Sequence, residues 1–462
     1  MGKFFLCTSI FLLSFRISGF SFQESPVPVS VTDQFVLTYV SANQFKIKHV
    51  PTNVEKTFNE NSFFFSQNET VQAVGNLSNT VANRAANTKA IQAAVHFQNH
   101  NGSVYFPAGI YHYDEVQIRK TRIRLFGEGD LSNGTLFVGY ENIHQGHSYF
   151  EVDGLTFREG GWIPDAIANT KPLIVLRNIE GGTISNCHFY GGVAAIKVAG
   201  IDYDDTQLWW HAGKIIVTNN QFFSNNHALK VEKHANVAPG RYSAGDFHFI
   251  NNMLRSMQGT SIDSEGQDGL VVQGNTFFSA KGRHIYIRQG HYIKITCNHL
   301  FENDQESIFL QNVRDFQVSN NTIVKPGWVD CGTNKYSGIR IQNWGLYGGG
   351  SNYNSDEALA RGTIANNSIR WPSLYGIDIR GGRGITVSNN IVDFPTISDW
   401  QSWNICPANT RPPDTQWAIF ADDNSTFCQF IDNITLGHPN QILNCCGGPS
   451  QNFSRQNAQM GN

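Results

Sequence analysis

The stretch "SIDSEGQDG" (261–269) places three carboxylate side chains, Asp263, Glu265 and Asp268, close together in the chain. Charged residues make up only 15% of the sequence, so such a cluster is unusual within it. Two carboxyl groups a few ångströms apart can cleave a glycosidic bond, one as the acid and the other as a nucleophile or base. The same oxygens can bind Ca²⁺, or can simply be solvated in a turn. The direction of each side chain decides between these roles, and the fold sets that direction.

A repeated phrase with two central polar residues, Φ-x-N-N-x-Φ with Φ apolar, indicates that fold. Its second Asn position falls at Cys187, Asn220, Asn252, Asn275, Asn298, Asn321, Asn367, Asn390 and Asn433. The commonest spacing, 23 residues, is too short for a propeller blade or a pair of armadillo helices. It is typical of one coil of a parallel β-helix, in which stacked coils share a core and identical Asn residues form a hydrogen-bonded ladder. The single step of 46 residues contains one readable strand, which predicts one coil with two insertions.

A second phrase, about eleven residues after most of these positions, alternates apolar and polar residues, as in "SIDSEG", "HIYIRQ" and "GIRIQN". A period of two predicts a strand with one buried face. A solenoid of helices is excluded because these runs are short, rich in Ile, Val, Phe and Thr, and broken by Gly and Asn. We therefore expect an all-β chain that forms a single-stranded parallel β-helix.

Residues 87–129 have the pattern of a short helix, capped at Thr88, followed by strands separated by Gly and Pro. Such a helix would cover the open end of the coil stack. The stretch resembles the start of the pectate-lyase-superfamily β-helix domain in Thr88, Ala90, Ile91, Gln92, Ala94, Gly102, Val104, Phe106, Pro107, Gly109, Tyr111, Leu125, Gly127 and Gly129. Asn87 stands where that superfamily has an acidic residue. The resemblance implies a right-handed coil and, as activities, glycoside hydrolysis, polysaccharide lysis or a tailspike function.

The chain divides into four predicted segments. Residues 1–21 have the charged start and short apolar run of a secretory signal peptide, although an uncleaved anchor is the alternative. Residues 22–80 show no clear period, 81–440 form the β-helix domain, and 441–462 are a C-terminal tail. We expect a secreted glycoprotein without a membrane span. The sequons at Asn320 and Asn366 are expected to be poor acceptors, because both are placed in the inward Asn ladder.

Alignment of the alternating phrases on their buried residues predicts the outward side chains. One outward column contains Lys230, Asp263, Tyr286, Phe309 and Arg340, and its neighbour contains Glu265, Arg288 and Gln311. Asp263 and Glu265 therefore project from one strand, with Cα atoms about 6.5–7 Å apart. Asp268 is expected in the turn that follows.

Three long insertions leave one edge of this face and bring aromatic residues beside the carboxyl pair. Aromatic rings next to carboxylates suit a sugar chain, because pyranose C–H faces stack on them. The predicted substrate-binding residues are Trp209, Trp210, His211, His234, Tyr286, Gln311, Arg340 and Trp344.

The favoured prediction is a glycoside hydrolase in which Asp263, Glu265, Lys230 and Arg288 are catalytic. The two cations would hold one carboxyl ionised while the other carries the acid proton. Outward arginines mildly favour an acidic polysaccharide as the substrate. A net charge of −3 without a basic stripe excludes nucleic acid as an expected partner. The hydrolase needs no cofactor, and the sequence does not predict the oligomeric state.

Three alternatives remain open. "IYIRQG" is loosely similar to the chondroitinase B and alginate lyase family, which implies Ca²⁺ on Asp263 and Glu265 and a role for Arg288 in β-elimination. That family's lysine is absent, since Leu270 occupies its place, and only Lys230 offers a substitute. The chain could instead be a non-catalytic glycan binder or adhesin. Finally, Lys230, Asp263, Glu265 and Arg288 could form only a surface salt-bridge ladder.

Overall fold

The structure is a computed structural model, and it describes residues 35–41, 44–49, 54–59, 70–73, 88, 91–92, 95, 103–106, 108–118, 123–127, 135–139, 143–146, 149–160, 171–177, 179, 181–198, 213–233, 244–327, 336–343, 360–394, 417–422, 425, 427–436, 443–445, 453–455 and 458–460.

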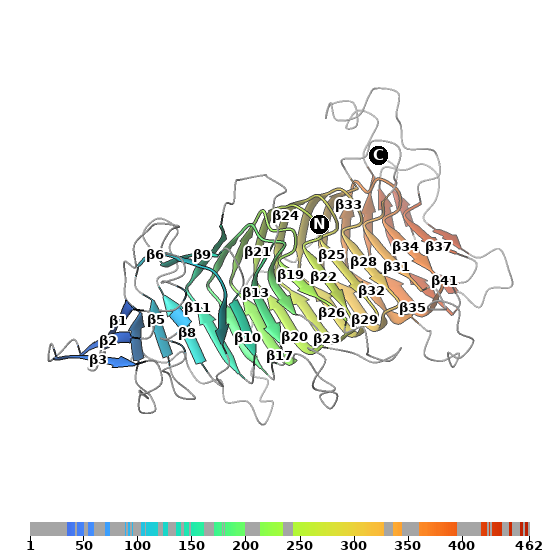
Figure 1. Ribbon diagram of the computed structural model, residues 1–462. Coiled ribbons are helices and arrows are strands. Elements are labelled where there is room, and N and C mark those ends of the chain that lie inside the picture. Colours follow the sequence, from blue (N-terminus) through green and yellow to red (C-terminus); the bar gives the residue numbers. More distant parts are fainter. Residues whose placement is uncertain are drawn as a thin grey trace, which may run out of the picture.

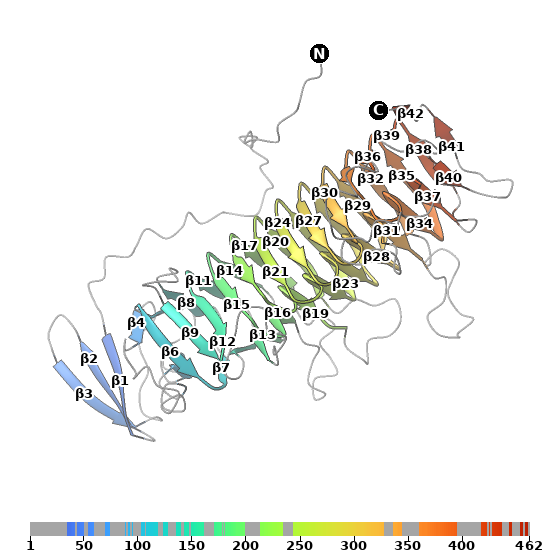
Figure 2. The same ribbon diagram turned by 90° about the horizontal axis from the view of Figure 1, so that it is seen from above.

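The strands of these residues form three long sheets (Figures 1 and 2). Sheet A contains β1 (Phe35–Ser41), β2 (Gln44–His49), β3 (Val54–Asn59), β4 (Thr70–Ala73), β5 (Ser103–Phe106), β8 (Ile123–Gly127), β11 (Phe150–Asp153), β14 (Gly182–Ser185), β17 (Gly213–Thr218), β20 (Ala244–Ile250), β23 (Gln267–Gln273), β26 (His291–Thr296), β29 (Arg314–Ser319), β32 (Ala360–Ala365), β35 (Gly382–Ser388), β38 (Gln429–Ile431) and β41 (Phe453–Arg455). Sheet B contains β6 (Gly109–Tyr113), β9 (Thr135–Gly139), β12 (Thr156–Glu159), β15 (His188–Tyr190), β18 (Gln221–Phe223), β21 (Met253–Met257), β24 (Thr276–Ala280), β27 (His299–Asn303), β30 (Thr322–Pro326), β33 (Ser368–Arg370), β36 (Ile391–Asp393), β39 (Ile434–Leu436) and β42 (Ala458–Met460). Sheet C contains β7 (Val116–Ile118), β10 (Ile143–Gly146), β13 (Pro172–Arg177), β16 (Ala194–Val198), β19 (Leu229–Val231), β22 (Ile262–Glu265), β25 (Ile285–Arg288), β28 (Ile308–Gln311), β31 (Ile339–Gln342), β34 (Ile377–Arg380), β37 (Ile419–Ala421) and β40 (Leu443–Cys445).

Successive coils of the chain visit the three sheets in turn. β23, β24 and β25 lie in sheets A, B and C, and β26 then pairs in parallel with β23 to start the next coil. Figure 1 shows the coils stacked along the long axis, in sequence order from blue to red. At the blue end, β1, β2 and β3 pair antiparallel within residues 22–80. At the red end, β40, β41 and β42 extend the three sheets into residues 441–462. The predicted parallel β-helix is confirmed.

Parallel pairing without a register shift stacks like residues inside the coils. Ile262, Ile285 and Ile308 occupy one inward position on successive strands and are fully buried. Phe189 stacks on Phe222 in the same way, with ring centroids 5.0 Å apart. No single coil can bury its apolar side, so the stack supplies the hydrophobic core.

The buried Asn ladder forms as predicted. The backbone N–H and the side-chain Nδ2 of Asn298 both donate to Oδ1 of Asn321, each at 3.0 Å. Its Nδ2 also donates to the Val272 carbonyl oxygen at 2.9 Å. Asn321 donates in the same way to Oδ1 of Asn367, which confirms that the step of 46 residues is one coil with insertions.

The first Asn of each pair makes the corner between two sheets and does not belong to the ladder. The prediction that Asn320 and Asn366 point inward was therefore wrong. Asn320 and Asn366 are exposed, with φ of 57° and 56°, while Asn321 and Asn367 form the ladder. Each corner between sheets A and B needs one residue in the left-handed region, and Asn tolerates that conformation better than most residues. Burial in the ladder therefore gives no reason to reject the two sequons.

The prediction that Asp268 lies in a turn was also wrong. Gly266, with φ of 70°, makes the corner after β22, and the chain is already in β23 at Gln267. Asp268 thus belongs to sheet A, where its Oδ1 lies 3.3 Å from Nδ1 of His291. It is separated from the Asp263 and Glu265 pair, which is on sheet C.

The predicted N-terminal helix is described only in part. Thr88, Ile91, Gln92 and Val95 are helical, and Ile91 and Val95 are buried. The Thr88 hydroxyl accepts a hydrogen bond from the Asp114 backbone N–H at 2.7 Å. The rest of the expected helix lies outside the described residues. Among the residues whose placement is described, no helix has the length and apolar character to cross a bilayer.

Candidate functional site on the outer face of sheet C

Strand β22 presents Asp263 and Glu265 outward, as its alternating sequence predicts. Ile262 and Ser264 are fully buried, while the side chains of Asp263 and Glu265 are 14% and 26% exposed. Parallel pairing places Asp263 between Lys230 and Tyr286, and Glu265 beside Arg288. Both carboxyl groups therefore lie on a face that solvent reaches.

Arg288 joins the two carboxyl groups. Its Nη2 lies 3.1 Å from Oδ1 of Asp263, and its Nη1 lies 3.0 Å from Oε2 of Glu265. Burial lowers the pKa of the Arg288 guanidinium, but the charges of Asp263 and Glu265 outweigh this effect and raise the pKa above its ordinary value. The guanidinium thus stays charged and fixes both carboxyls at one point.

Lys230 shares the face but has another partner. Its Nζ lies 3.5 Å from Oε1 of Glu232, whose other oxygen lies 2.9 Å from Nζ of Lys197. Lys233, which the sequence did not single out, donates to Oε1 of Gln289 at 2.6 Å. Burial lowers the pKa of Lys233, and the charge of Glu265 acts in the opposite direction. Lys233 is therefore a partly buried amine that senses the charge of Glu265.

A further row of polar side chains lies just before the strands of sheet C and was not predicted. We call it the Thr260 row; its members are His227, Thr260, Arg283 and Glu306. Nδ1 of His227 lies 2.6 Å from the Thr260 carbonyl oxygen, and Nε of Arg283 lies 2.9 Å from Oε2 of Glu306. Ser261 and Ile262 are both buried, so strict alternation of buried and outward residues does not hold at the start of the strand. A search for residues that repeat every second position therefore does not find this row.

His227 is the member of this row with the potential for acid–base chemistry. A carbonyl oxygen only accepts, so Nδ1 carries the proton and Nε2 presents its lone pair. Burial lowers the pKa of His227, while the Thr260 hydrogen bond and the charge of Asp263 oppose the shift. The imidazole is thus a neutral proton acceptor within the electrostatic reach of Asp263.

The ring of Tyr286, a predicted substrate-binding residue, packs against neighbouring side chains. Its ring stacks on Phe309, with centroids 5.0 Å apart, and the guanidinium carbons of Arg283 and Arg288 lie 4.6 Å and 5.2 Å from its centroid. Its hydroxyl donates to Oε1 of Gln311, another predicted substrate-binding residue. Both the ring and the hydroxyl of Tyr286 are therefore engaged by neighbouring side chains.

Arg340 belongs to a buried ion-pair chain. Its Nη1 lies 3.0 Å from Oε1 of Glu306, and its Nε lies 3.5 Å from Oδ2 of Asp378. Both of these carboxylate side chains are only 1% exposed. Burial raises the pKa of Asp378, against the lowering effect of Arg380 and Arg340. Around Arg340, the outer face of sheet C therefore forms the salt-bridge ladder that the sequence offered as an alternative, and Arg340 is held by both of its carboxylate partners.

The remaining predicted residues, Trp209, Trp210, His211, His234 and Trp344, lie outside the described residues. The ends of their insertions are placed. They follow β16, β19 and β31 of sheet C and lead to β17, β20 and β32 of sheet A. All three insertions therefore connect the same two sheets, one of which, sheet C, carries Asp263.

The Ca²⁺ set implied by the lyase alternative fits this geometry poorly. Asp263 and Glu265 both direct an oxygen at the Arg288 guanidinium, so a cation would have to displace that charge. Within the described part of the chain, no three His, Cys, Asp or Glu side chains are grouped to hold a metal ion.

Comparisons with known proteins agree with the architecture. A family described as "Right handed beta helix region" matches residues 240–393. A mutant of DFA-IIIase from Arthrobacter chlorophenolicus A6, solved in complex with DFA-III, has a TM-score of 0.51 at 14% identity, covering 81% of this chain and 93% of its own. The catalytic unit of a GH87 α-1,3-glucanase from Streptomyces thermodiastaticus strain HF3-3 has a TM-score of 0.50 at 14% identity, covering 81% and 66%. The search of curated proteins finds no match. Together with the coil stack, these findings show that the chain is a right-handed parallel β-helix protein.

Proposed function

We propose that this protein is an exported glycoside hydrolase that cleaves an acidic polysaccharide on the outer face of sheet C. The observation that carries the proposal is the pair of outward carboxyls two positions apart on β22, held by one guanidinium. Their spacing on the strand, about 6.5–7 Å between Cα atoms, is compatible with the carboxyl separations of glycosidases. Support at the level of fold comes from the α-1,3-glucanase neighbour. Export rests on the sequence of residues 1–21.

Arg288 suggests why the substrate is acidic. One carboxyl must carry the acid proton when the glycosidic bond breaks, and an ion pair with arginine opposes protonation. A carboxylate or sulfate on the sugar competes for the Arg288 guanidinium and releases one carboxyl from it. That carboxyl then serves as the acid. The other stays ionised as the nucleophile or base, and Nε2 of the neutral His227 imidazole accepts a hydrogen bond from a substrate hydroxyl beside it.

The test is cleavage of a polysaccharide panel by the purified protein and by the Asp263→Asn and Glu265→Gln variants. Each variant should lose activity by about 10²–10⁴-fold, the usual contribution of an acid or base catalyst. Glu302→Gln is the matched control, because Glu302 is an exposed carboxylate that pairs with Lys325 on sheet B at 2.8 Å. Full cleavage by both site variants would overturn the proposal. Retained glycan binding without any cleavage by the parent protein would identify a binder.

A polysaccharide lyase is the second candidate, and Lys233 is the observation that favours it. A lysine whose pKa is lowered by burial can remove a proton from carbon, and Glu265 and Arg288 lie on the same face. Elimination leaves an unsaturated product that absorbs ultraviolet light. Absorbance that rises during cleavage and disappears in Lys233→Gln would select the lyase, and chelation would show whether Ca²⁺ takes part.

A further inference from the structure

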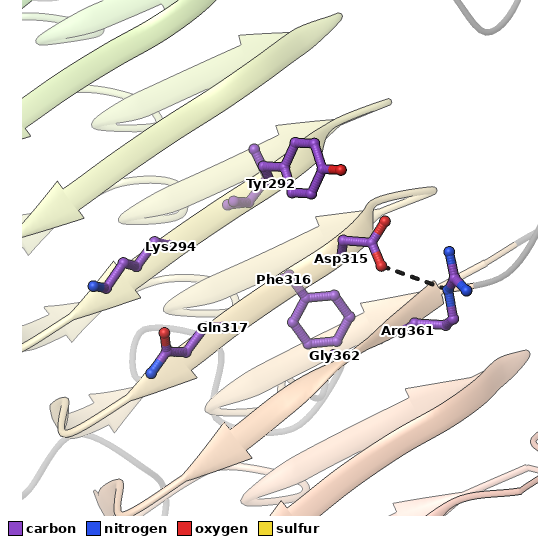
Figure 3. A pocket seen from close by; sticks show the side chains of 8 residues that line it. Tyr292, Lys294, Asp315, Phe316, Gln317, Arg361 and Gly362 are labelled. Atoms are coloured by element: carbon purple, nitrogen blue, oxygen red, sulfur yellow. Dashed lines mark ion pairs between the residues drawn. The ribbon is translucent and has the colours of Figure 1, made fainter.

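A shallow hollow of about 400 Å³ lies on the outer face of sheet A, over strands β26, β29 and β32 (Figure 3). Tyr292 and Asp315 occupy equivalent positions on neighbouring strands, and Lys294 and Gln317 occupy the equivalent positions two residues further on. Arg361 follows Asp315 on the side of β32 (Figure 3). The hollow therefore lies between two rows of outward side chains that run along the stack, on a different sheet from Asp263.

Two cationic groups border the hollow with their charged ends open. Lys294 is exposed and makes no ion pair with the described residues. Arg361, with a side chain 57% exposed, contacts Oδ1 of Asp315 through Nε at 3.5 Å, which leaves its two terminal nitrogens toward solvent. The other oxygen of Asp315 lies 2.8 Å from Nε2 of His291. Asp315 is thus shared between Arg361 and His291, while Lys294 and the part of the Arg361 guanidinium that does not face Asp315 can meet a ligand.

The other side chains suit a sugar ring. Tyr292 is 63% exposed and packs on the His291 imidazole, with ring centroids 3.7 Å apart. The open part of the phenol ring can stack on the C–H face of a pyranose. Gln317 donates through Nε2 to the Ser319 hydroxyl at 3.1 Å and keeps Oε1 as an acceptor for a sugar hydroxyl.

We propose that this hollow binds one acidic sugar unit of the polysaccharide and holds the polymer without cutting it. The carboxylate or sulfate of that unit pairs with the Arg361 guanidinium, which can form two parallel hydrogen bonds, while Lys294 on the opposite side of the hollow adds a second attractive charge (Figure 3). The ring of the sugar unit lies against Tyr292. The inference rests on the proposed function only for the class of polymer, since none of these side chains belongs to the catalytic face.

Binding is measured in an Asp263→Asn background, so that the polymer stays intact. Affinity electrophoresis and calorimetry compare a polyuronate, a sulfated polysaccharide and a neutral glucan. Lys294→Gln and Arg361→Gln should each weaken binding of the preferred acidic polymer about tenfold, the effect of losing one charge-assisted contact. Lys281→Gln, which removes an exposed lysine from the turn between sheets B and C, should bind as the parent does. The polyuronate and sulfate arms identify the acidic group.

The inference fails if Lys294→Gln and Arg361→Gln bind as tightly as the parent, if the neutral glucan binds as well as the acidic polymers, or if no acidic polymer binds. These results are separate from those for catalysis. If binding depends on Lys294 while the protein with Asp263 intact cleaves nothing, the hollow is supported and the proposed hydrolase is overturned. If cleavage depends on Asp263 while Lys294→Gln binds the polymer as the parent does, the proposed hydrolase is supported and the hollow is overturned as a binding site.

Discussion

Asp263 and Glu265 differ from Glu306 and Asp378, two other carboxylates on this side of the stack, in how far solvent reaches them. Glu306 and Asp378 also pair with arginines, but their side chains are only 1% exposed, against 14% and 26% for the acidic pair. A ligand can therefore contact Asp263 and Glu265 while the other two stay within the buried ladder. The same side of the stack thus carries a structural salt-bridge ladder, which contains Glu306 and Asp378, and a few coils away the more exposed pair Asp263 and Glu265.

His227 predicts a pH dependence for cleavage. Its pKa lies below the ordinary 6.5, so the imidazole stays neutral as the pH falls through that value and protonates only at a lower pH. Besides the backbone of Thr260, the charged groups Asp263, Lys230 and Glu232 surround it. Activity that needs the free Nε2 is present above the lowered pKa and lost below it. His227→Gln should lower kcat/KM and remove this acid limb from its pH profile.

His248→Gln is the control for that measurement. Burial also lowers the pKa of His248, but this residue lies on β20 of sheet A. Its replacement should leave the pH profile of kcat/KM as in the parent. An unchanged acid limb in His227→Gln would show that His227 takes no part in the reaction.

His284 predicts a pH dependence of stability. The imidazole is fully buried beside Phe277, its Nε2 donates to the Phe301 carbonyl oxygen at 3.1 Å, and burial lowers its pKa to about 3. The unfolded chain takes up this proton near pH 6.5, so the stabilising effect is present above that pH and is lost progressively down to about pH 3. Between pH 6.5 and pH 4.5 the loss is about 2–3 kcal/mol. Urea unfolding of the parent and of His284→Gln at pH 7.5 and 4.5 measures it.

The difference between the two pH values is the quantity to compare, because His284→Gln also changes packing at both. The variant should lose about 2–3 kcal/mol less than the parent on acidification. His299→Gln removes an exposed histidine from β27 and should lose as much as the parent. Equal losses in His284→Gln and the parent would mean that His284 is not neutral in the fold.

At the scale of the strands, sequence periodicity predicts the direction of a side chain only where a single rule holds. Alternation correctly places Asp263 and Glu265 outward, because a strand has two faces. It misses His227 and Arg283, since two consecutive buried residues precede each outward position of the strand proper. It also misplaces Asp268, because one glycine, Gly266, is enough for the corner. Some ion partners come from neighbouring coils, so the pairing of Glu232 with Lys197 of the preceding coil is not readable within one repeat.

The Asn ladder predicts a large stability loss for a small substitution. Asn298 is fully buried, and its side chain donates to Asn321 and Val272 while its Oδ1 accepts from the backbone and side chain of Asn275. Asn298→Ala leaves several buried polar groups without partners, at about 1–3 kcal/mol each before relaxation, so we expect a loss of about 2–4 kcal/mol in urea unfolding. Asn298→Asp keeps the size but removes the Nδ2 donor and should also destabilise.

Lys281→Ala, on an exposed turn, is the control for the ladder and should change the free energy of unfolding by no more than about 0.5 kcal/mol. If Asn298→Asp is as stable as the parent, size alone matters at this position and the hydrogen-bonded ladder contributes little.

At the scale of the whole molecule, the stack presents long faces that run in the same direction. Sheets C and A meet at the corner made by Gly266, and the three insertions also connect these two sheets. The acidic pair therefore lies on β22 of one face, and the Tyr292 hollow lies over β26, β29 and β32 of the adjacent one, starting one coil further along the stack. The placement of the two faces can be predicted from the order of the strands. The hollow could not be predicted, because it depends on side-chain positions that the repeat pattern does not contain.

A polymer that reaches both faces should bind more tightly than a fragment that reaches one, because the second contact is intramolecular. We expect kcat/KM to rise by about tenfold or more from short acidic oligosaccharides to the long chain at low salt. Most of this gain should disappear at 1 M salt, where screening shortens the range of the Lys294 and Arg361 charges to about 3 Å. Lys294→Gln should abolish the same gain at low salt while cleaving short oligosaccharides at the parent rate. A length dependence that survives Lys294→Gln would place the second contact elsewhere on the protein.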